Sequence, residues 1–263
     1  MTQNAPTSPT HLAKFHVVAV LPALNEALAV AEVVGGLLAL QDADGAPLLA
    51  HVIVADNGSN DGTTAVASAA GAQVVQEARR GYGYACMAGI HAALLDTSVT
   101  HILFVDADRS VVLNETPLLF AAGQAGADLV IGARVHVMPD AMTLPQRFGN
   151  ALACRLARWI WGFPMTDLGP FRLIERKALL DIDMQDMTYG WTVEMQVKAF
   201  QLRMRVVEVP VSVQARIGVS KVSGTVRGVI GAGIGIFSMI GKLWWRGKKS
   251  KGAAHQSNMA EPK

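Results

Sequence analysis

The chain has 263 residues, of which 51% are hydrophobic and 17% are charged, and this composition excludes a disordered or fibrous protein. Its formal net charge of +2 is too small for bulk electrostatic attraction to nucleic acid, so we expect no nucleic-acid partner. The two cysteines lie far apart and lack metal-ligand spacing, which argues against a disulfide framework and a zinc site.

The first 15 residues are polar and lack the apolar core of a secretory signal, so they predict a disordered lead-in and a cytoplasmic protein. From residue 16 onward, β-branched runs alternate with Ala- and Leu-rich stretches, which is typical of βαβ units in one α/β domain with a mainly parallel sheet. The pattern predicts strands at 16–21, 51–55, 73–76, 101–105, 129–132 and 205–209, with helices at 26–40, 63–70 and 83–95.

Polar residues follow the first four predicted strands. Because parallel sheets bind ligands beyond the carboxyl ends of their strands, these loops are the candidate site. Each loop has an ordinary explanation by itself as a helix cap or a turn. Taken together they predict a polar site for a metal and a nucleotide, formed by Pro22, Asn25 and Glu26, by residues 56–63, by residues 79–84 and by residues 106–110.

The segment ILFVDAD places two carboxylates, Asp106 and Asp108, at the end of an apolar strand. A hard divalent cation such as Mg²⁺ or Mn²⁺ is commonly held by one or two carboxylates together with phosphate oxygens and water. A short Asp-x-Asp also recurs by chance in many proteins. The pair therefore predicts a metal–diphosphate site only in combination with the neighbouring loops.

Four motifs together resemble the inverting family-2 glycosyltransferases of the GT-A fold: LPALNE at 21–26, VADNGSNDGT at 54–63, VDAD at 105–108 and TDLGPFR at 166–172. The resemblance covers about residues 16–225 and implies a single GT-A-like domain, with a mainly parallel mixed sheet flanked by helices. It implies a UDP- or GDP-sugar donor and a Mg²⁺ or Mn²⁺ cofactor held by Asp106 and Asp108. Asn57 stands where the family often has a second Asp, so the base stays open.

The same resemblance assigns nucleotide contacts to Pro22, Asn25, Glu26 and Asp56. A carboxylate accepts hydrogen bonds from a base N–H or from ribose hydroxyls, which favours Asp56 over Asn57 for that contact. Arg79, beside the glycine-spaced run GYGYA, is a candidate for the diphosphate, with a solvated turn as an equal alternative.

The second half of the chain is basic and amphipathic, with Arg147 in a helical pattern that has one apolar and one cationic face. The run VVEVPVSVQARIGVSK resembles the polyprenyl- and dolichol-phosphate sugar synthase branch of the family. That branch implies phosphate recognition by Arg216, Ser220 and Lys221, and Arg134 and Arg147 match positions that bind the acceptor phosphate. The phrase GPFR departs from the SGFR of many lipid-phosphate enzymes.

The acceptor decides whether a general base is required. A lipid phosphate is already an anion and needs no strong base, whereas a hydroxyl acceptor needs a carboxylate within hydrogen-bond reach. Asp167 and Glu194 are the candidate bases for a soluble or lipid hydroxyl acceptor, each with an ordinary structural role as its alternative. A polyprenyl phosphate is the preferred acceptor. A nucleotidyltransferase is disfavoured because LPALNE replaces the expected Gly-rich loop, and a silent binding module is a third class.

An apolar C-terminal helix is predicted at 226–246, followed by a basic polar tail at 247–263. The apolar run is shorter than the roughly twenty residues of a membrane span. Its tryptophans and the lysines after them are typical of an interfacial segment, with a closing helix packed on the domain as the equal alternative. The sequence therefore predicts peripheral contact with the inner face of a membrane.

Overall fold

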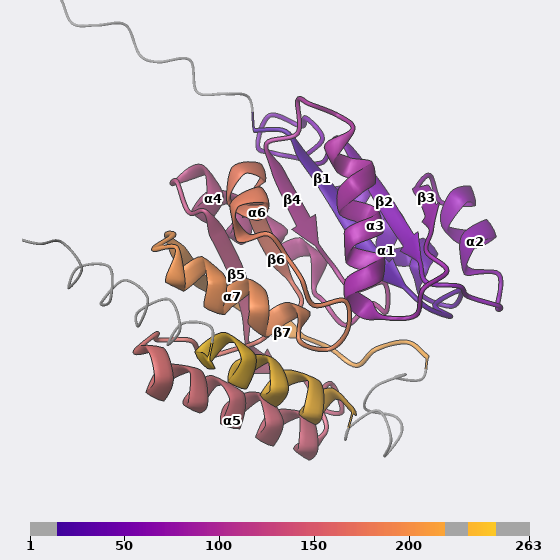
Figure 1. Cartoon of the computed structure of the whole chain (residues 1–263). Coiled ribbons are helices and arrows are strands. Elements are labelled where there is room, and N and C mark those ends of the chain that lie inside the picture. Colours follow the sequence, from indigo (N-terminus) through magenta and orange to yellow (C-terminus); the bar gives the residue numbers. More distant parts are fainter. Residues whose placement is uncertain (1–14, 219–230, 246–263) are drawn as a thin grey trace, which may run out of the picture.

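Seven strands form one mixed sheet in the computed structural model, which describes residues 15–218 and 231–245 (Figure 1). The order across the sheet is β3-β2-β1-β4-β6-β5-β7, and β6 runs antiparallel to both of its neighbours. The predicted α/β domain with a mainly parallel mixed sheet is confirmed. The strands are β1 (Val17–Ala23), β2 (His51–Asp56), β3 (Gln73–Gln76), β4 (His101–Phe104), β5 (Leu129–Val137), β6 (Arg172–Glu175) and β7 (Val206–Val213).

Helices cover both faces of the sheet. Successive side chains of a strand point to opposite faces, so Ala19 lies in a buried cluster with residues of α1, α2 and α4, whereas Val18 lies in a second cluster with residues of α3, α6 and α7. This alternation builds two separate apolar layers from one strand. The helices are α1 (Val30–Leu38), α2 (Thr63–Ala69), α3 (Tyr82–Leu94), the 3-10 turn η1 (Leu113–Glu115), α4 (Thr116–Gln124), α5 (Leu144–Trp161), α6 (Arg176–Ile182) and α7 (Trp191–Gln201).

The sequence pattern located six of the seven strands and missed β6. The strand begins with Arg172, a charged residue that hides the apolar pattern even though the side chain is only 1% exposed. Burial is tolerated because the guanidinium donates to the carbonyls of Gly169 at 2.7 Å and Thr192 at 2.8 Å. The same burial lowers the pKa of Arg172 to about 10.

A third apolar cluster joins α5 and α7 to residues 231–245, which are helical and lie alongside α5 (Figure 1). Met239, Ile240 and Leu243 are buried in it. This segment is the described part of the helix predicted at 226–246; residues 1–14 of the lead-in and the tail at 247–263 lie outside the described residues. No helix in the described ranges has the length and apolar character to cross a membrane.

Strand β1 is central to the position of the site. Its two neighbours, β2 and β4, run parallel to it, and the chain reaches them in opposite directions across the sheet. Such a switch point leaves a crevice beyond the carboxyl ends of the strands. The loops after β1, β2 and β4 therefore meet at one edge.

Candidate active site

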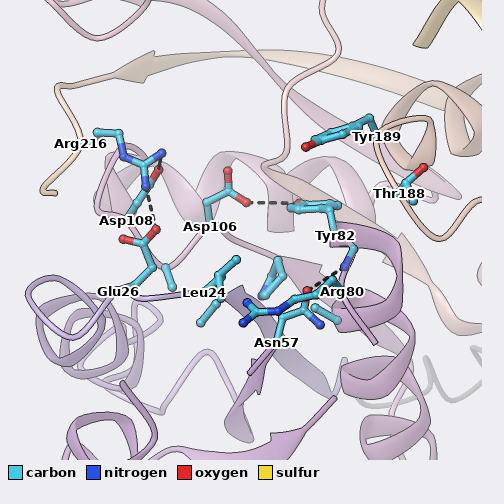
Figure 2. Close-up of a pocket in the computed structure, with 15 residues that line it drawn as sticks. Leu24, Glu26, Asn57, Arg80, Tyr82, Asp106, Asp108, Thr188, Tyr189 and Arg216 are labelled. Carbon is cyan, nitrogen blue, oxygen red and sulfur yellow. Dashed lines mark hydrogen bonds and ion pairs between the residues drawn. The ribbon is translucent and has the colours of Figure 1, made fainter. Parts of the chain in front are cut away.

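Two adjoining cavities of about 360 Å³ each lie at this edge, a size common for small-molecule sites. The first cavity is bounded by the loops after β1, β2 and β4 and by residues 188 and 189 (Figure 2). The second cavity lies toward β5, β7 and the start of α5. Four side chains line both cavities and form the wall between them: Tyr82, Asp106, Asp108 and Arg216.

Asp106 and Asp108 follow β4 and lie in this shared wall, as the strand-end position predicts. The Tyr82 hydroxyl donates to Oδ1 of Asp106 at 3.2 Å. Burial, together with the negative charge of Asp108, raises the pKa of Asp106 to about 7. Within the part of the chain that the structure describes, Arg216 is the basic side chain in an ion pair with one of these two carboxylates, and the site suits a divalent cation as a further positive charge. Within the described residues, no cluster of three or more acidic, His or Cys ligands forms, so phosphate oxygens and water would complete the coordination.

Arg216 brings the segment after β7 to the same wall. Its Nη1 lies 3.2 Å from Oδ2 of Asp108, and its Nη2 donates to Oε1 of Glu26 at 2.7 Å. The backbone N–H of Ile217 donates to the carbonyl of Asp108 at 2.9 Å, which holds this segment against the loop after β4. A guanidinium is therefore fixed beside the carboxylate pair, at the junction of the two cavities.

The predicted nucleotide contacts divide into two groups. Pro22 and Glu26 line the first cavity, whereas Asn25, Asp56 and Arg79 are not among its lining residues. Asn25 joins two loops, because its backbone N–H donates to the Ser59 hydroxyl at 2.8 Å. These three residues support the loops around the cavity.

Asp56 is almost fully buried and accepts hydrogen bonds from the Ser59 backbone at 2.8 Å and from the Thr64 hydroxyl. Burial alone would raise the pKa of Asp56, but these hydrogen bonds outweigh it and lower the pKa. Arg79 forms a two-point pair with Glu77, at 2.7 and 2.9 Å, and lies over the ring of Tyr84. The Asp56 carboxylate is thus held by hydrogen bonds within its loop, and the Arg79 guanidinium is paired with Glu77.

Asn57 and Arg80, the neighbours of these residues, line the first cavity instead. The Asn57 amide donates to the carbonyls of Glu77 and Arg79, and its Oδ1 accepts from the N–H of Gly81 at 2.9 Å. The sequence favours Asp56 over Asn57 for the nucleotide contact, from the family resemblance and from hydrogen-bond chemistry. The structure places Asn57 in the cavity wall, with its polar atoms engaged by the backbone of the next loop.

Tyr82 and Tyr189 line the first cavity and were not singled out from the sequence, although the glycine-spaced run GYGYA contains Tyr82. A Cβ at Gly81 would lie 2.3 Å from the carbonyl oxygen of Met187, and one at Gly83 would lie 2.3 Å from that of Asp186. Only glycine permits this backbone approach. The two glycines therefore allow the segment before α7 to lie against the start of α3. Tyr189 of this segment lines the cavity wall.

Arg134 lines the second cavity and is paired with Asp167. Its Nε and Nη2 donate to the two carboxylate oxygens at 2.8 and 2.7 Å. Burial would raise the pKa of Asp167, but these bonds outweigh it and lower the pKa. Arg147 is exposed on α5 and does not line either cavity, and Ser220 and Lys221 lie outside the described residues.

Glu194 is fully buried at the start of α7. Its Oε2 accepts from the backbone N–H groups of Gln185 at 3.0 Å and Asp186 at 2.6 Å, and Oε1 lies 2.8 Å from Nζ of Lys198. Neither Asp167 nor Glu194 lines a cavity described here, whereas Asp140, which the sequence analysis did not consider, lines the second.

The sequence model of Glycosyl transferase family 2 matches residues 18–182, which include β1 to β6 and the Asp106–Asp108 pair. An uncharacterised glycosyltransferase of Mycobacterium tuberculosis is 37% identical over 215 residues, which are 81% of this chain and 93% of that protein. The chain belongs to glycosyl transferase family 2. A second relative, a polyprenol monophosphomannose synthase of Mycolicibacterium smegmatis, is 30% identical over 189 residues, which are 66% of this chain and 71% of that protein.

A solved structure of glucosyl-3-phosphoglycerate synthase from Mycobacterium tuberculosis, in complex with Mn²⁺, UDP and glucosyl-3-phosphoglycerate, resembles this glycosyltransferase with a TM-score of 0.67. The likeness covers 87% of this chain and 79% of that one at 21% sequence identity. At this identity it shows the fold only. The predicted GT-A fold is therefore confirmed.

Proposed function

We propose that this family-2 glycosyltransferase transfers a sugar, with inversion, from a UDP- or GDP-sugar to a polyprenyl phosphate, and that it requires Mg²⁺ or Mn²⁺. The observation that carries the proposal is the Asp106–Asp108 pair in the wall between two cavities of similar size. The nucleoside would occupy the first cavity and the acceptor phosphate the second. The reacting sugar carbon would then lie at the shared wall.

The charges along this wall suit a leaving nucleoside diphosphate. Asp106 and Asp108 would hold the cation, which supplies neutralisation of the departing diphosphate. Tyr82 orients the carboxylate of Asp106 through its hydrogen bond. Arg216, already 3.2 Å from Asp108, provides a guanidinium that can turn to phosphate oxygens once donor and cation are bound. The resemblance of the fold to a synthase solved with Mn²⁺ and UDP supports this arrangement.

The state of the carboxylates supports a phosphate acceptor. Asp167 is held by Arg134, and Glu194 is held by two backbone N–H groups, so neither is placed to accept a proton from a substrate. A phosphate oxygen attacks as an anion and needs no such base. The similarity to a polyprenol monophosphomannose synthase points to the same acceptor class.

A hydroxyl acceptor is the second candidate, because Asp140 lines the second cavity. Its carboxylate could act as the base that a hydroxyl requires. This role replaces the one expected for Asp167 or Glu194, which the same cavity does not include.

One face of α5 supports contact with a lipid surface. Residues 141–143 and 146 line the second cavity, so α5 begins at that cavity. From there, large apolar side chains with exposed area recur along the helix among basic residues, an arrangement typical of interfacial helices. The exposed apolar residues are Leu144, Phe148, Leu152 and Trp159, and the basic ones are Arg147, Arg155 and Arg158.

The test is a panel of UDP- and GDP-sugars offered with short-chain polyprenyl phosphate or with the corresponding free polyprenol. We expect transfer from one donor to the phosphate alone, and loss of transfer in EDTA or in Asp108→Ala. Transfer to the free polyprenol that is lost in Asp140→Asn would establish the hydroxyl alternative. A protein that transfers nothing across the panel would overturn both the polyprenyl-phosphate and the polyprenol acceptor.

A further inference from the structure

The first cavity has two chemically different ends. Glu26, Asp108 and Arg216 lie at one end, while Tyr189 lies at the other, across the cavity from Leu24 and Asn57 (Figure 2). Tyr189 is 38% exposed and comes from the segment just before α7. A nucleoside diphosphate has the same division, with a charged end and a flat aromatic end.

The backbone on both sides of Tyr189 is held from within the domain. One carboxylate oxygen of Asp186 accepts from the N–H of Thr188 at 2.7 Å and from that of Gly190 at 3.0 Å. The buried Glu194 holds the preceding residues, since it accepts from the N–H of Asp186. The roles of these two carboxylates are therefore to fix the segment that carries Tyr189.

The C-terminal helix at 231–245 supports Tyr189 from the other side. A Cβ at Gly235 would lie 2.8 Å from Cβ of Tyr189, closer than real Cβ atoms approach, and a Cβ at Gly231 would lie 3.4 Å from its ring. A Cβ at Gly190 would similarly meet Cβ of Met239 at 2.9 Å. The helix can lie this close only because Gly235 and Gly190 have no side chain. Gly231 and Gly235 thus lie on the side of this helix that faces Tyr189 in the cavity wall.

We propose that Tyr189 is the aromatic surface on which the nucleoside base of the donor stacks, and that the C-terminal helix is required to position it. The inference rests on the proposed function, because it places a nucleoside diphosphate in the first cavity. Aromatic side chains stack on any base through its π face, so Tyr189 contributes affinity while other groups select the base. The C-terminal helix thereby affects donor binding although it does not line the cavity.

A purely structural role for Tyr189 makes a different prediction. If the side chain only fills space against Gly235, then Leu should replace it with little effect on nucleotide binding. If its ring stacks on the base, Phe should replace it and Leu should not. The two substitutions therefore separate packing from stacking.

The experiment is calorimetric titration of the full chain with UDP and with GDP in the presence of Mn²⁺. We expect Tyr189→Phe to bind the preferred nucleotide like the wild type and Tyr189→Leu to bind it about tenfold more weakly. Gly235→Ala should also weaken binding, because its Cβ displaces Tyr189. Gly233→Ala is the matched control, since a Cβ there has no atom within 4 Å. Both alanine variants gain helix propensity, so a weaker helix does not account for a difference between them.

The outcomes separate the inference from the function on which it rests. Wild-type protein that binds neither nucleotide would overturn both. Wild-type binding retained in Tyr189→Leu would overturn the stacking role and leave the proposed function intact. Wild-type binding retained in Gly235→Ala would overturn the positioning role of the helix. Thermal melts of each variant confirm that the measured proteins are folded.

Discussion

Two acidic centres at the same edge of the sheet have opposite electrostatic states. At the end of β4, burial and the charge of Asp108 raise the pKa of Asp106 to about 7. Before β6, Asp167 is also buried, but two hydrogen bonds from Arg134 outweigh burial and lower its pKa. The difference lies in the positive charge that the fold supplies. A carboxylate balanced by its own arginine serves the structure, whereas an incompletely balanced pair is available to a cation.

The largest effect is expected for Asp108→Ala, which removes one of the two proposed metal ligands. We expect the rate of sugar transfer to fall by at least about 10³-fold, because cation neutralisation of a leaving group contributes several kcal/mol. Titration with Mn²⁺ should show a matching loss of affinity. Asp44→Ala, which removes an exposed carboxylate remote from the cavities, is the control and should leave both quantities unchanged. Full activity in Asp108→Ala would contradict a metal site here.

Substitution at the Asp167–Arg134 pair should change the stability of the folded protein. Asp167→Ala leaves the guanidinium of Arg134, whose side chain is 20% exposed, without its partner. We expect the free energy of unfolding to fall by about 3 kcal/mol in urea denaturation. The double variant Asp167→Leu with Arg134→Met, which removes both charges, should recover much of this loss. Because the folded pKa of Asp167 is lowered, the contribution of the pair is present above the ordinary pKa of 3.8 and is lost as the pH falls through the folded value.

The unbalanced centre should show the opposite pH dependence. Between pH 4 and 7, Asp106 binds a proton in the folded state that an ordinary Asp with a pKa of 3.8 has released. The unfolded state therefore binds fewer protons, and the stability of metal-free protein should fall as the pH rises through this window. We expect a loss of about 2 kcal/mol, roughly half of what three pKa units represent, because the side chain is in partial contact with solvent.

The variant Asp106→Asn tests directly whether Asp106 causes this loss of stability. In EDTA at pH 8 the variant should be more stable than the wild type, since it has no buried charge at this position. Added Mn²⁺ should raise the thermal midpoint of the wild type and leave that of the variant unchanged. A variant that is less stable than the wild type in EDTA would show that Asp106 is already balanced in the folded protein.

The smallest effect is expected for Arg216, whose positive charge lies beside the Asp106–Asp108 pair. Arg216→Met removes the cation that lies 3.2 Å from Asp108, so Mn²⁺ should bind the nucleotide-free protein about fivefold more tightly, equivalent to about 1 kcal/mol. The KM for the donor should rise at the same time, because a positive charge is lost from the diphosphate site. Arg216→Lys keeps the charge and should bind Mn²⁺ like the wild type. Weaker Mn²⁺ binding in Arg216→Met would contradict the expectation that the positive charge of Arg216 opposes binding of the cation beside Asp108.

Local pattern was sufficient for six of the seven strands and for the position of the Asp106–Asp108 pair. A buried strand such as β4 is visible as an apolar run, and the residues that follow it must lie at its carboxyl end. Asp106 and Asp108 were therefore placed at the site from their sequence position alone. This prediction succeeded because it depended only on one strand and on the loop that follows it.

Local pattern was insufficient for the wall of the first cavity, where it did not indicate which of two adjacent residues, Asp56 or Asn57, lines the cavity. Asp56 ends β2, and Asn57 follows it. Successive side chains of an extended chain point in opposite directions, so one of the two faces the cavity and the other faces the start of α2. Hydrogen-bond chemistry favoured Asp56 for the cavity, whereas the contacts of Asp56 with Ser59 and Thr64 place its carboxylate within the loop.

The sequence by itself determined the α/β architecture, the edge of the sheet at which the site lies and the presence of Asp106 and Asp108 there, because hydrophobic periodicity and strand ends are local properties. Only the tertiary structure decided which charged side chains are balanced. Asp167 and Glu26 are paired with Arg134 and Arg216, which reach them from other elements or loops. Charge compensation acts through space, over distances that the order of residues along the chain does not specify.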